Sequence, residues 1–206
     1  MPALPQHNAI IDEIIHARLE DGSQVCIRSI RPNDELRMRE GIELLSAQSR
    51  YLRFFSPQPM PSDSVIERLV DADGHRHIAW GAILTQDEDR PAVGAVHAVR
   101  DNTTSASAEF SVAVVDDYQG LGLARMLIAV LLINCRLEAI ASLDVQVLSE
   151  NRAAASLITS LGAKRCKSEY SVTDYVLDTT VALANLKAEE DNPGLCDVFA
   201  SLEKYL

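Results

Sequence analysis

One glutamate and one glycine-bearing turn stand out in this sequence, because their types and spacing suit chemistry on a phosphate-containing ligand. Glu109 directly precedes the apolar run 110–115, and the turn Gln119-Gly120-Leu121-Gly122-Leu123-Ala124 follows that run. The pattern predicts a strand, a tight turn and then a helix from about Gly122 to Leu137. Unpaired N–H groups at such a helix start attract anions, and glycine lets a phosphate oxygen approach the backbone. The turn therefore suits a pyrophosphate-containing ligand.

The turn lacks the spacing of the common nucleotide motifs. Neither GxGxxG nor GxxxxGK[ST] is present, so its two glycines do not identify a ligand by themselves. The fuller pattern Gln119-x-x-Gly122-x-Ala124, between a valine-rich strand and a helix, resembles the coenzyme A pyrophosphate motif of the GNAT superfamily of N-acetyltransferases. More narrowly, Arg50–Phe55 and Ala108–Phe110 make the chain similar to the catalytic domain of bacterial protein lysine acetyltransferases.

This resemblance implies a cosubstrate and the residues that hold it. Acetyl-CoA is the expected cosubstrate, no metal is expected, and the expected partner is an amine substrate, either a protein lysine or a small amine. The backbone of Val112, Ala113 and Val114 would pair with the pantetheine arm, which Asn151 would also contact, and a strand amide would polarise the thioester carbonyl. The turn and helix start would hold the pyrophosphate through Gln119, Gly120, Leu121, Gly122, Leu123, Ala124 and Arg125.

The resemblance also places Glu109 where lysine-acetylating members carry a general base. A base is required because an ammonium has no lone pair for attack, and a carboxylate in bulk water is too weak to deprotonate lysine directly. We expect Glu109 to act through an ordered water, or on an amine whose pKa burial has lowered, contributing ~10²- to 10⁴-fold. Many members carry a tyrosine seven residues beyond the asparagine, where this chain has Ile158. A non-catalytic acyl-coenzyme A sensor or interaction module therefore stays open as an alternative.

These residues need a sheet that opens beside the turn. The resemblance implies an α/β (α+β) GNAT fold, with a mixed, mostly antiparallel sheet of about six to seven strands, splayed at the cofactor cleft, and about four flanking helices. We expect an N-terminal helix and hairpin arm over 1–21, the GNAT domain over 22–178, and a C-terminal helical tail over 179–206. The tail could be an arm for a homodimer, a cap over the site or a loosely held end.

The N-terminal half is predicted from spacing and turn signals. Apolar residues within 8–16 recur at helical spacing and predict a short helix. Asp21-Gly22 lies between two apolar runs and predicts a hairpin. Asn33 can cap a first helix, and Ser62 or Asp63 can cap a second one after three prolines. The apolar side of the first helix is expected to hold Leu36, Ile42, Leu44 and Leu45.

Further strands are predicted over 77–85, 92–99 and 143–148, with one or two more within 165–178. A helix before Gly162 follows the strand over 143–148. In the strand that follows Ala108, side chains alternate between two faces. One face is expected to hold Phe110, Val112 and Val114, and the other Glu109, Ser111 and Ala113.

Composition narrows the class of protein. The chain has 206 residues and a net charge of −11, a charge that disfavours nucleic acid as a partner. Its longest apolar run carries Arg125, Asn134 and Arg136, so we expect a buried helix and no membrane span. No secretory pattern precedes it, and a cytoplasmic location is expected. The four cysteines lack ligand-like spacing and are expected to be free and mostly buried.

Several other residues favour structural roles. The segment 50–55 is expected to plug the core beneath a loop, and Trp80 to lie in the core. His75 and His77 lack a third ligand nearby, so we expect no metal there. His97 is expected to be a strand residue, with a role in the cleft left open. A nucleotide-binding oxidoreductase fragment is disfavoured because the phosphate motif comes late in the chain.

Overall fold

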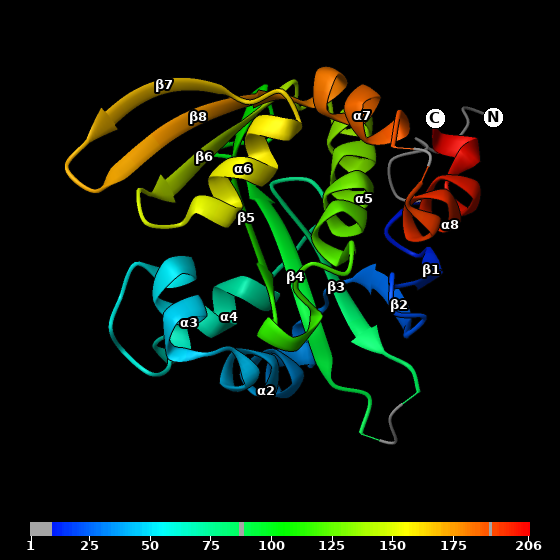
Figure 1. The fold of residues 1–206 in the computed structure, drawn as a ribbon, viewed down its shortest axis with the longest axis horizontal. Coiled ribbons are helices and arrows are strands. Elements are labelled where there is room, and N and C mark those ends of the chain that lie inside the picture. The colour runs from blue at the N-terminus through cyan, green and yellow to red at the C-terminus, as the bar shows by residue number, and fades with distance from the viewer. Residues whose placement is uncertain (1–9, 87–88, 190) are drawn as a thin grey trace.

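The computed structural model describes residues 10–86, 89–189 and 191–206, whose strands join in one eight-stranded sheet (Figure 1). The strand order is β1-β2-β3-β4-β5-β6-β8-β7, and only the β5–β6 pair is parallel. This is the mixed, mostly antiparallel sheet predicted from the sequence, with more strands than expected. The strands are β1 Ile14–Arg18, β2 Gln24–Ser29, β3 His77–Leu84, β4 Ala92–Val99, β5 Ser107–Val114, β6 Ser142–Leu148, β7 Lys164–Glu169 and β8 Val172–Asp178.

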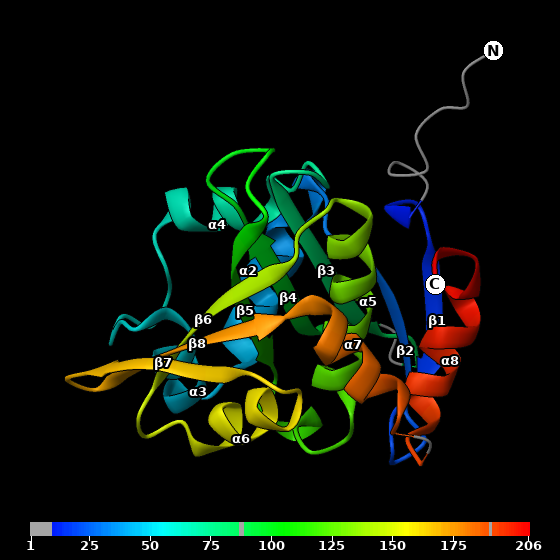
Figure 2. The ribbon, with the colours of Figure 1, turned by 90° about the horizontal axis from the view of Figure 1, so that it is seen from above.

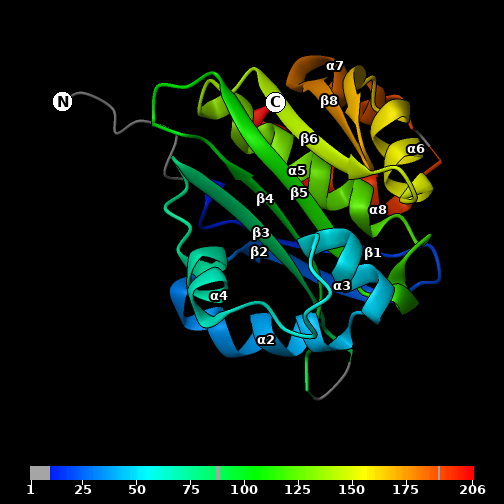
Figure 3. The same cartoon turned by 90° about the vertical axis from the view of Figure 1, so that its left-hand side faces the viewer.

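Helices cover both faces of the sheet. Figure 3 shows α2 and α4 on one side of β3 and β4, and α5 on the other side. Figure 2 shows α7 beside α5 and α8 beside β1. The described residues form more helices than the four expected: α2 Glu35–Leu44, α3 Ala47–Phe54, α4 Asp63–Val70, α5 Leu123–Leu137, α6 Arg152–Ser160, α7 Thr179–Lys187 and α8 Pro193–Ser201.

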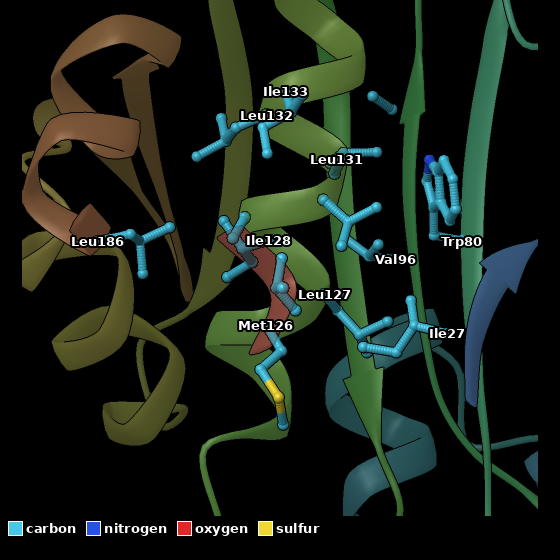
Figure 4. Packing of buried hydrophobic residues seen from close by; sticks show 14 of the residues in the cluster. Ile27, Trp80, Val96, Met126, Leu127, Ile128, Leu131, Leu132, Ile133 and Leu186 are labelled. Carbon is cyan, nitrogen blue, oxygen red and sulfur yellow. The ribbon is translucent and has the colours of Figure 1, made fainter. Parts of the chain in front are cut away.

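The long apolar helix α5 is the centre of the core, as predicted. Its side chains from Met126 to Cys135 are all buried, and they pack against β3, β4 and α7 (Figure 4). Trp80 is fully buried, and its Nε1 donates a hydrogen bond to Oδ1 of Asn134 at 3.1 Å. Burying one large aliphatic side chain of α5 stabilises the folded chain by about 1.5–3 kcal/mol. Among the described helices, none has the length and apolar character needed to cross a membrane.

The sheet splays between β5 and β6, beside the predicted turn. The parallel pairing of these strands runs from Ser107 opposite Ser142 to Phe110 opposite Val145 and ends there. On its other side, β5 stays paired with β4 as far as Val114. The segment 111–114 therefore presents a backbone edge without a strand partner.

The prediction of a helix over 8–16 is wrong from Ile14 onward, because the structure has a strand there. Ile14–Arg18 is β1, which pairs antiparallel with β2. Its burial alternates, with Ile15 buried and Ile14 exposed, so the pairing of the strand overrides the helical spacing. Residues 8 and 9 lie outside the described residues. The predicted hairpin is confirmed, with Gly22 at φ +90°. The division into arm, domain and tail stays a prediction.

The region before β3 contains three α-helices where two were expected. Asn33 lies in a 3₁₀ turn, and Asp34 is the N-cap residue of α2, so the predicted cap was wrong. Ile42 and Leu45 are buried as expected, but Leu36 and Leu44 are 69% and 51% exposed. The additional helix is α3, which carries the segment expected to plug the core.

Candidate functional site

A groove of about 830 Å³ runs along the free edge of β5 to the N-terminus of α5. The helix α6 and the segment after α7 form its other walls. We call it the glycine groove, and it is lined by Glu20, Val112, Ala113, Val114, Tyr118, Gln119, Gly120, Gly122, Leu123, Ala124, Arg125, Asn151, Ala153, Ala154, Leu157, Ala188, Glu189, Asp191 and Asn192. All predicted cofactor-binding residues except Leu121 line it.

The N-terminus of α5 is open toward this groove. Gly122 is its N-cap residue at φ +85°, and no side chain caps the helix, so its first N–H groups have no partner within the helix. Gly120 has φ +75°, and a Cβ placed on it would meet no atom within 4 Å. This conformation and this open space bring bare backbone to the groove wall, as an anion site requires.

Side-chain amides hold the other walls of the groove. Gln119 donates from Nε2 to the Val114 carbonyl at 3.0 Å, which ties the turn to the end of β5. Asn151 is the N-cap of α6, and its Oδ1 accepts from the Ala154 N–H at 3.0 Å. The Leu121 carbonyl accepts a hydrogen bond from the Glu20 N–H at 3.2 Å.

Acidic residues surround the predicted phosphate site, a feature that the sequence did not suggest. Arg125 forms an ion pair with Glu189, whose nearer oxygen lies 2.8 Å from Nε, and its Nη2 donates to Ser160 at 3.2 Å. Glu20 and Asp191 also line the groove. The Arg125 side chain is therefore already partnered, whereas no side chain caps the N-terminus of α5.

A second cavity of about 400 Å³ lies between α3, β5 and β6, and we call it the α3 cleft. It shares wall residues with the glycine groove, so the two cavities adjoin each other along β5. It is lined by Leu45, Ser49, Leu52, Arg53, Phe54, Phe55, Glu109, Phe110, Ser111, Val112, Ala113, Val114, Gln119, Val145, Gln146, Val147, Asn151, Ala153, Ala154, Leu157 and Ile158.

Glu109 lies in this cleft, at the point where β5 leaves β6. Its side chain is exposed, whereas Phe110 is buried, so the predicted alternation of faces is confirmed. Ile158 is 2% exposed and presents an apolar wall to the same cleft. The structure thus brings the predicted base and the predicted cofactor residues into two adjoining cavities.

The helix α3 is held over the cleft by Asp116, which follows β5. The carboxylate of Asp116 accepts hydrogen bonds from the Ser46 N–H at 2.9 Å and from the Ser46 and Ser49 hydroxyls at 2.8 Å. Burial opposes ionisation here, but these bonds outweigh it and lower the pKa of Asp116. The start of α3 is therefore tied to the strand that carries Glu109.

Leu52, Arg53 and Phe54 of α3 were expected to belong to the core, but they line the cleft. Arg53 and Phe54 form part of its wall, and Phe55 is 43% exposed, so the predicted core plug was wrong. Arg50 does have a structural role, since its Nη1 donates to the Glu43 carbonyl at 3.2 Å. Desolvation lowers the pKa of Arg53 to about 10, against the opposing effect of Glu109. In the sequence, Arg53 stands directly before two phenylalanines, and this was the signal that could have indicated a residue of the cleft.

His97 is buried beside the α3 cleft and forms a pair with His77. The two rings meet through Nδ1 of His97 and Nε2 of His77 at 3.0 Å, while Nδ1 of His77 lies 3.1 Å from the Asp71 carbonyl. A carbonyl only accepts, so His77 carries its proton on Nδ1, and Nδ1 of His97 must donate. Burial, then the charge of Arg53, hold the pKa of His97 well below its usual range.

The cysteines and histidines form no metal-like cluster in the parts of the chain described. His75 contacts Glu138 at 2.9 Å, away from the histidine pair. Of the four cysteines, only Cys135 is buried, while Cys26 is half-buried and Cys166 and Cys196 are exposed. The prediction of mostly buried thiols was therefore wrong.

Comparisons with known proteins show which family this chain resembles. The model of the acetyltransferase (GNAT) family matches residues 42–163. "Acetyltransferase PA5475" of Pseudomonas aeruginosa is 31% identical over 144 residues, which cover 70% of this chain and 77% of that protein. "Acetyltransferase Pat" of Mycolicibacterium smegmatis is 26% identical over 158 residues, which cover 77% of this chain and 46% of that relative. The chain thus spans about half the length of that relative.

A solved structure shares the fold. The GNAT domain of S. lividans PAT matches with a TM-score of 0.73 at 23% identity, covering 80% of this chain and 96% of that domain. Its likeness supports the splayed sheet and its flanking helices. Together with a family model that covers more than half of the sequence, it leads to one conclusion: this chain belongs to the acetyltransferase (GNAT) family.

Proposed function

We propose that this chain transfers an acetyl group from acetyl-CoA to an amine. One observation carries the proposal: a free strand edge runs from the uncapped N-terminus of α5 toward Glu109 along two adjoining cavities. A long ligand with an anionic end and an acyl end suits such a space, because the helix start favours the anion and the strand edge can pair with an amide-bearing arm.

The residues present fit coenzyme A. The turn amides from Gly120 to Arg125 would hold the pyrophosphate, and the edge 112–114 would hold the pantetheine arm. Asn151 would orient that arm, although its Oδ1 already caps α6. When bound, acetyl-CoA supplies a thioester whose acetyl carbon can be attacked by an amine. An amide of the β5 edge would donate to the thioester oxygen as negative charge develops there.

Glu109 is proposed to remove the proton from the incoming ammonium. It would do so through an ordered water, or directly where the cleft has lowered the pKa of the amine. Holding both reactants in one cleft supplies much of the acceleration, because it replaces a bimolecular encounter by a positioned one. The mechanism thus relies on proximity and electrostatics, without a covalent enzyme intermediate.

The apolar Ile158 favours a second candidate function. With isoleucine at this position, no side chain is assigned to protonate the leaving thiolate. A coenzyme A thiolate can leave with little help, so turnover remains the first proposal. A non-catalytic acyl-coenzyme A sensor would bind the same ligands and release no thiol.

The acceptor is proposed to be a protein lysine, and a small amine is the alternative, because fold alone does not fix the substrate. Likeness to proteins named as acetyltransferases, one of them called Pat, supports the class of reaction. The proposal places the activity in the cytoplasm, which cell fractionation would test. A homodimer is the proposed assembly, which light scattering would test.

Ligand binding is tested by thermal stabilisation. Acetyl-CoA or coenzyme A at about one hundred times its dissociation constant should stabilise the fold by roughly 2.7 kcal/mol, whereas ATP and NAD should not. No stabilisation by either coenzyme would refute the proposal. Thiol release with lysine peptides, polyamines and amino acids then separates the enzyme from the sensor.

A further inference from the structure

Arg53 is the cation of the α3 cleft; the charge of Glu109 acts on it there, but the two side chains form no ion pair. Its guanidinium carbon lies 4.9 Å from the centroid of the Phe54 ring, and it makes no hydrogen bond or ion pair to any residue that the structure describes. Arg28 and Arg125, by contrast, each lie within 2.8 Å of a carboxylate oxygen. Arg53 is thus held in place by an aromatic ring while its N–H donors stay free.

The position of Arg53 makes an unpaired charge costly. It lines both the α3 cleft and a small apolar pocket of about 70 Å³ beneath α2 and α3. The protein around it removes water from the guanidinium, as the lowered pKa of Arg53 reflects. A desolvated charge is destabilising unless an anion pairs with it. A guanidinium with free donors in a cleft is therefore suited to bind a planar anion such as a carboxylate.

Arg53 shares the α3 cleft with one other charged side chain, that of Glu109, because the remaining titratable groups near it are paired or neutral. Asp34 lines the small pocket, but its oxygens are occupied by Arg28 at 2.7 Å, the Arg31 N–H at 2.9 Å and Arg37 at 3.3 Å. His97 is neutral, as its hydrogen-bonded chain and burial require. Among the residues that line the α3 cleft, Glu109 is the acidic one and Arg53 the basic one.

We propose that the α3 cleft recognises an acceptor that carries a carboxylate beside its amine, with Arg53 binding the carboxylate while Glu109 faces the amine. This inference rests on the proposed function and names the substrate class of the same site. The positive Arg53 and the negative Glu109 of the cleft complement the carboxylate and the ammonium of such an acceptor. The carboxylate can come from an acidic residue next to a peptide lysine, or from a free amino acid.

Matched acceptors test the inference on the full chain. One pair of peptides carries a lysine flanked by Asp or by Asn, and a second pair is lysine and its decarboxylated analogue cadaverine. Thiol release gives kcat/KM for the unchanged protein, for Arg53→Met and for Arg68→Met. Arg68 is the matched control, because it is exposed on α4 and does not line the cleft. Methionine keeps an unbranched apolar stem that can pack on Phe54.

The unchanged protein and Arg68→Met should prefer the carboxylate-bearing member of at least one pair by about 30-fold or more, as expected for a desolvated charge pair. Arg53→Met should lose that preference and keep its rate on the neutral member. Preference within the peptides assigns the carboxylate to a flanking residue, and preference for lysine over cadaverine assigns it to the amino acid. Equal use of both members in both pairs, or an equal loss on all acceptors in Arg53→Met, would overturn the inference.

Direct binding separates this outcome from failure of the proposed function. If no acceptor releases thiol, calorimetry of the same acceptors is performed on the complex with coenzyme A. Tighter binding of a carboxylate-bearing acceptor that is lost in Arg53→Met supports the inference without turnover. Equal binding of both members of each pair overturns it.

Discussion

Arg125 and Glu189 are 64 positions apart in the sequence, and the guanidinium Nε of one lies 2.8 Å from the carboxylate of the other at the mouth of the glycine groove. The pair connects the start of α5 to the segment after α7. It also places a negative charge where the proposed ligand carries phosphates. Coenzyme A would therefore compete with Glu189 for the same arginine.

Replacing this glutamate should strengthen coenzyme binding. In Glu189→Gln the guanidinium of Arg125 loses its counter-ion and becomes available to a phosphate. We expect the Kd of coenzyme A, measured by calorimetry, to fall roughly twofold to fivefold, in keeping with a half-exposed ion pair. Asp197→Asn, which breaks the pair with Arg18 at 3.2 Å on α8, is the control and should leave the Kd unchanged. An unchanged or higher Kd in Glu189→Gln would contradict this competition.

The turn offers a matched pair of glycine substitutions. Gly120 and Gly22 both have positive φ, and a Cβ on either would meet no atom within 4 Å. Gly120→Ala and Gly22→Ala should therefore each cost about 1–2 kcal/mol of stability in urea titrations, through backbone strain alone. Only Gly120→Ala should raise the Kd of coenzyme A, by roughly tenfold, or about 1.4 kcal/mol. Equal affinities in both variants would place the pyrophosphate elsewhere.

The buried histidine should make stability depend on pH. An unfolded histidine titrates near 6.5, whereas His97 in the fold titrates well below that value. Between the two values the unfolded chain binds the additional proton, so stability is complete above about pH 6.5 and is lost as the pH falls. The loss should approach about 1.4 kcal/mol per pH unit.

A variant of His97 isolates that contribution. His97→Gln keeps a donor toward His77 but cannot take up a proton, so its unfolding free energy should fall less steeply between pH 6.5 and 5. Urea titrations at several pH values measure the slope. The exposed His16 provides the control, and His16→Gln should keep the steeper slope. Equal slopes for all three proteins would show that His97 takes up its proton over the same pH range in the folded and the unfolded chain.

The regular elements were predictable where their pattern was strong. The helix α5 and the strand β4 came out as expected, because one carries an apolar run and the other lies between clear turn signals. The spacing over 8–16 fitted a helix and an alternating strand equally, and pairing with β2 decided the outcome. The helix α3 was missed because it is only 8 residues long and depends on the long-range bonds of Asp116 to Ser46 and Ser49.

The candidate site was predictable only where its residues lie close together in the sequence. The glycine turn and Glu109 are local signals, since each is set by a strand and the residues next to it. The charges that tune the site come from distant segments, as with Glu189 beside Arg125 and Arg53 in the cleft of Glu109. No spacing rule connects such residues, so only the folded chain shows them together.

Thiol release by Glu109→Gln tests directly whether Glu109 serves amine acetylation in a chain that binds coenzyme A. The comparison uses acetyl-CoA with the best acceptor of the panel, over a range of pH, and Glu67→Gln on the exposed face of α4 as control. We expect kcat to fall ~10²- to 10⁴-fold in Glu109→Gln, with unchanged thermal stabilisation by acetyl-CoA and with full activity in the control. Unchanged turnover of Glu109→Gln across that pH range would contradict the account.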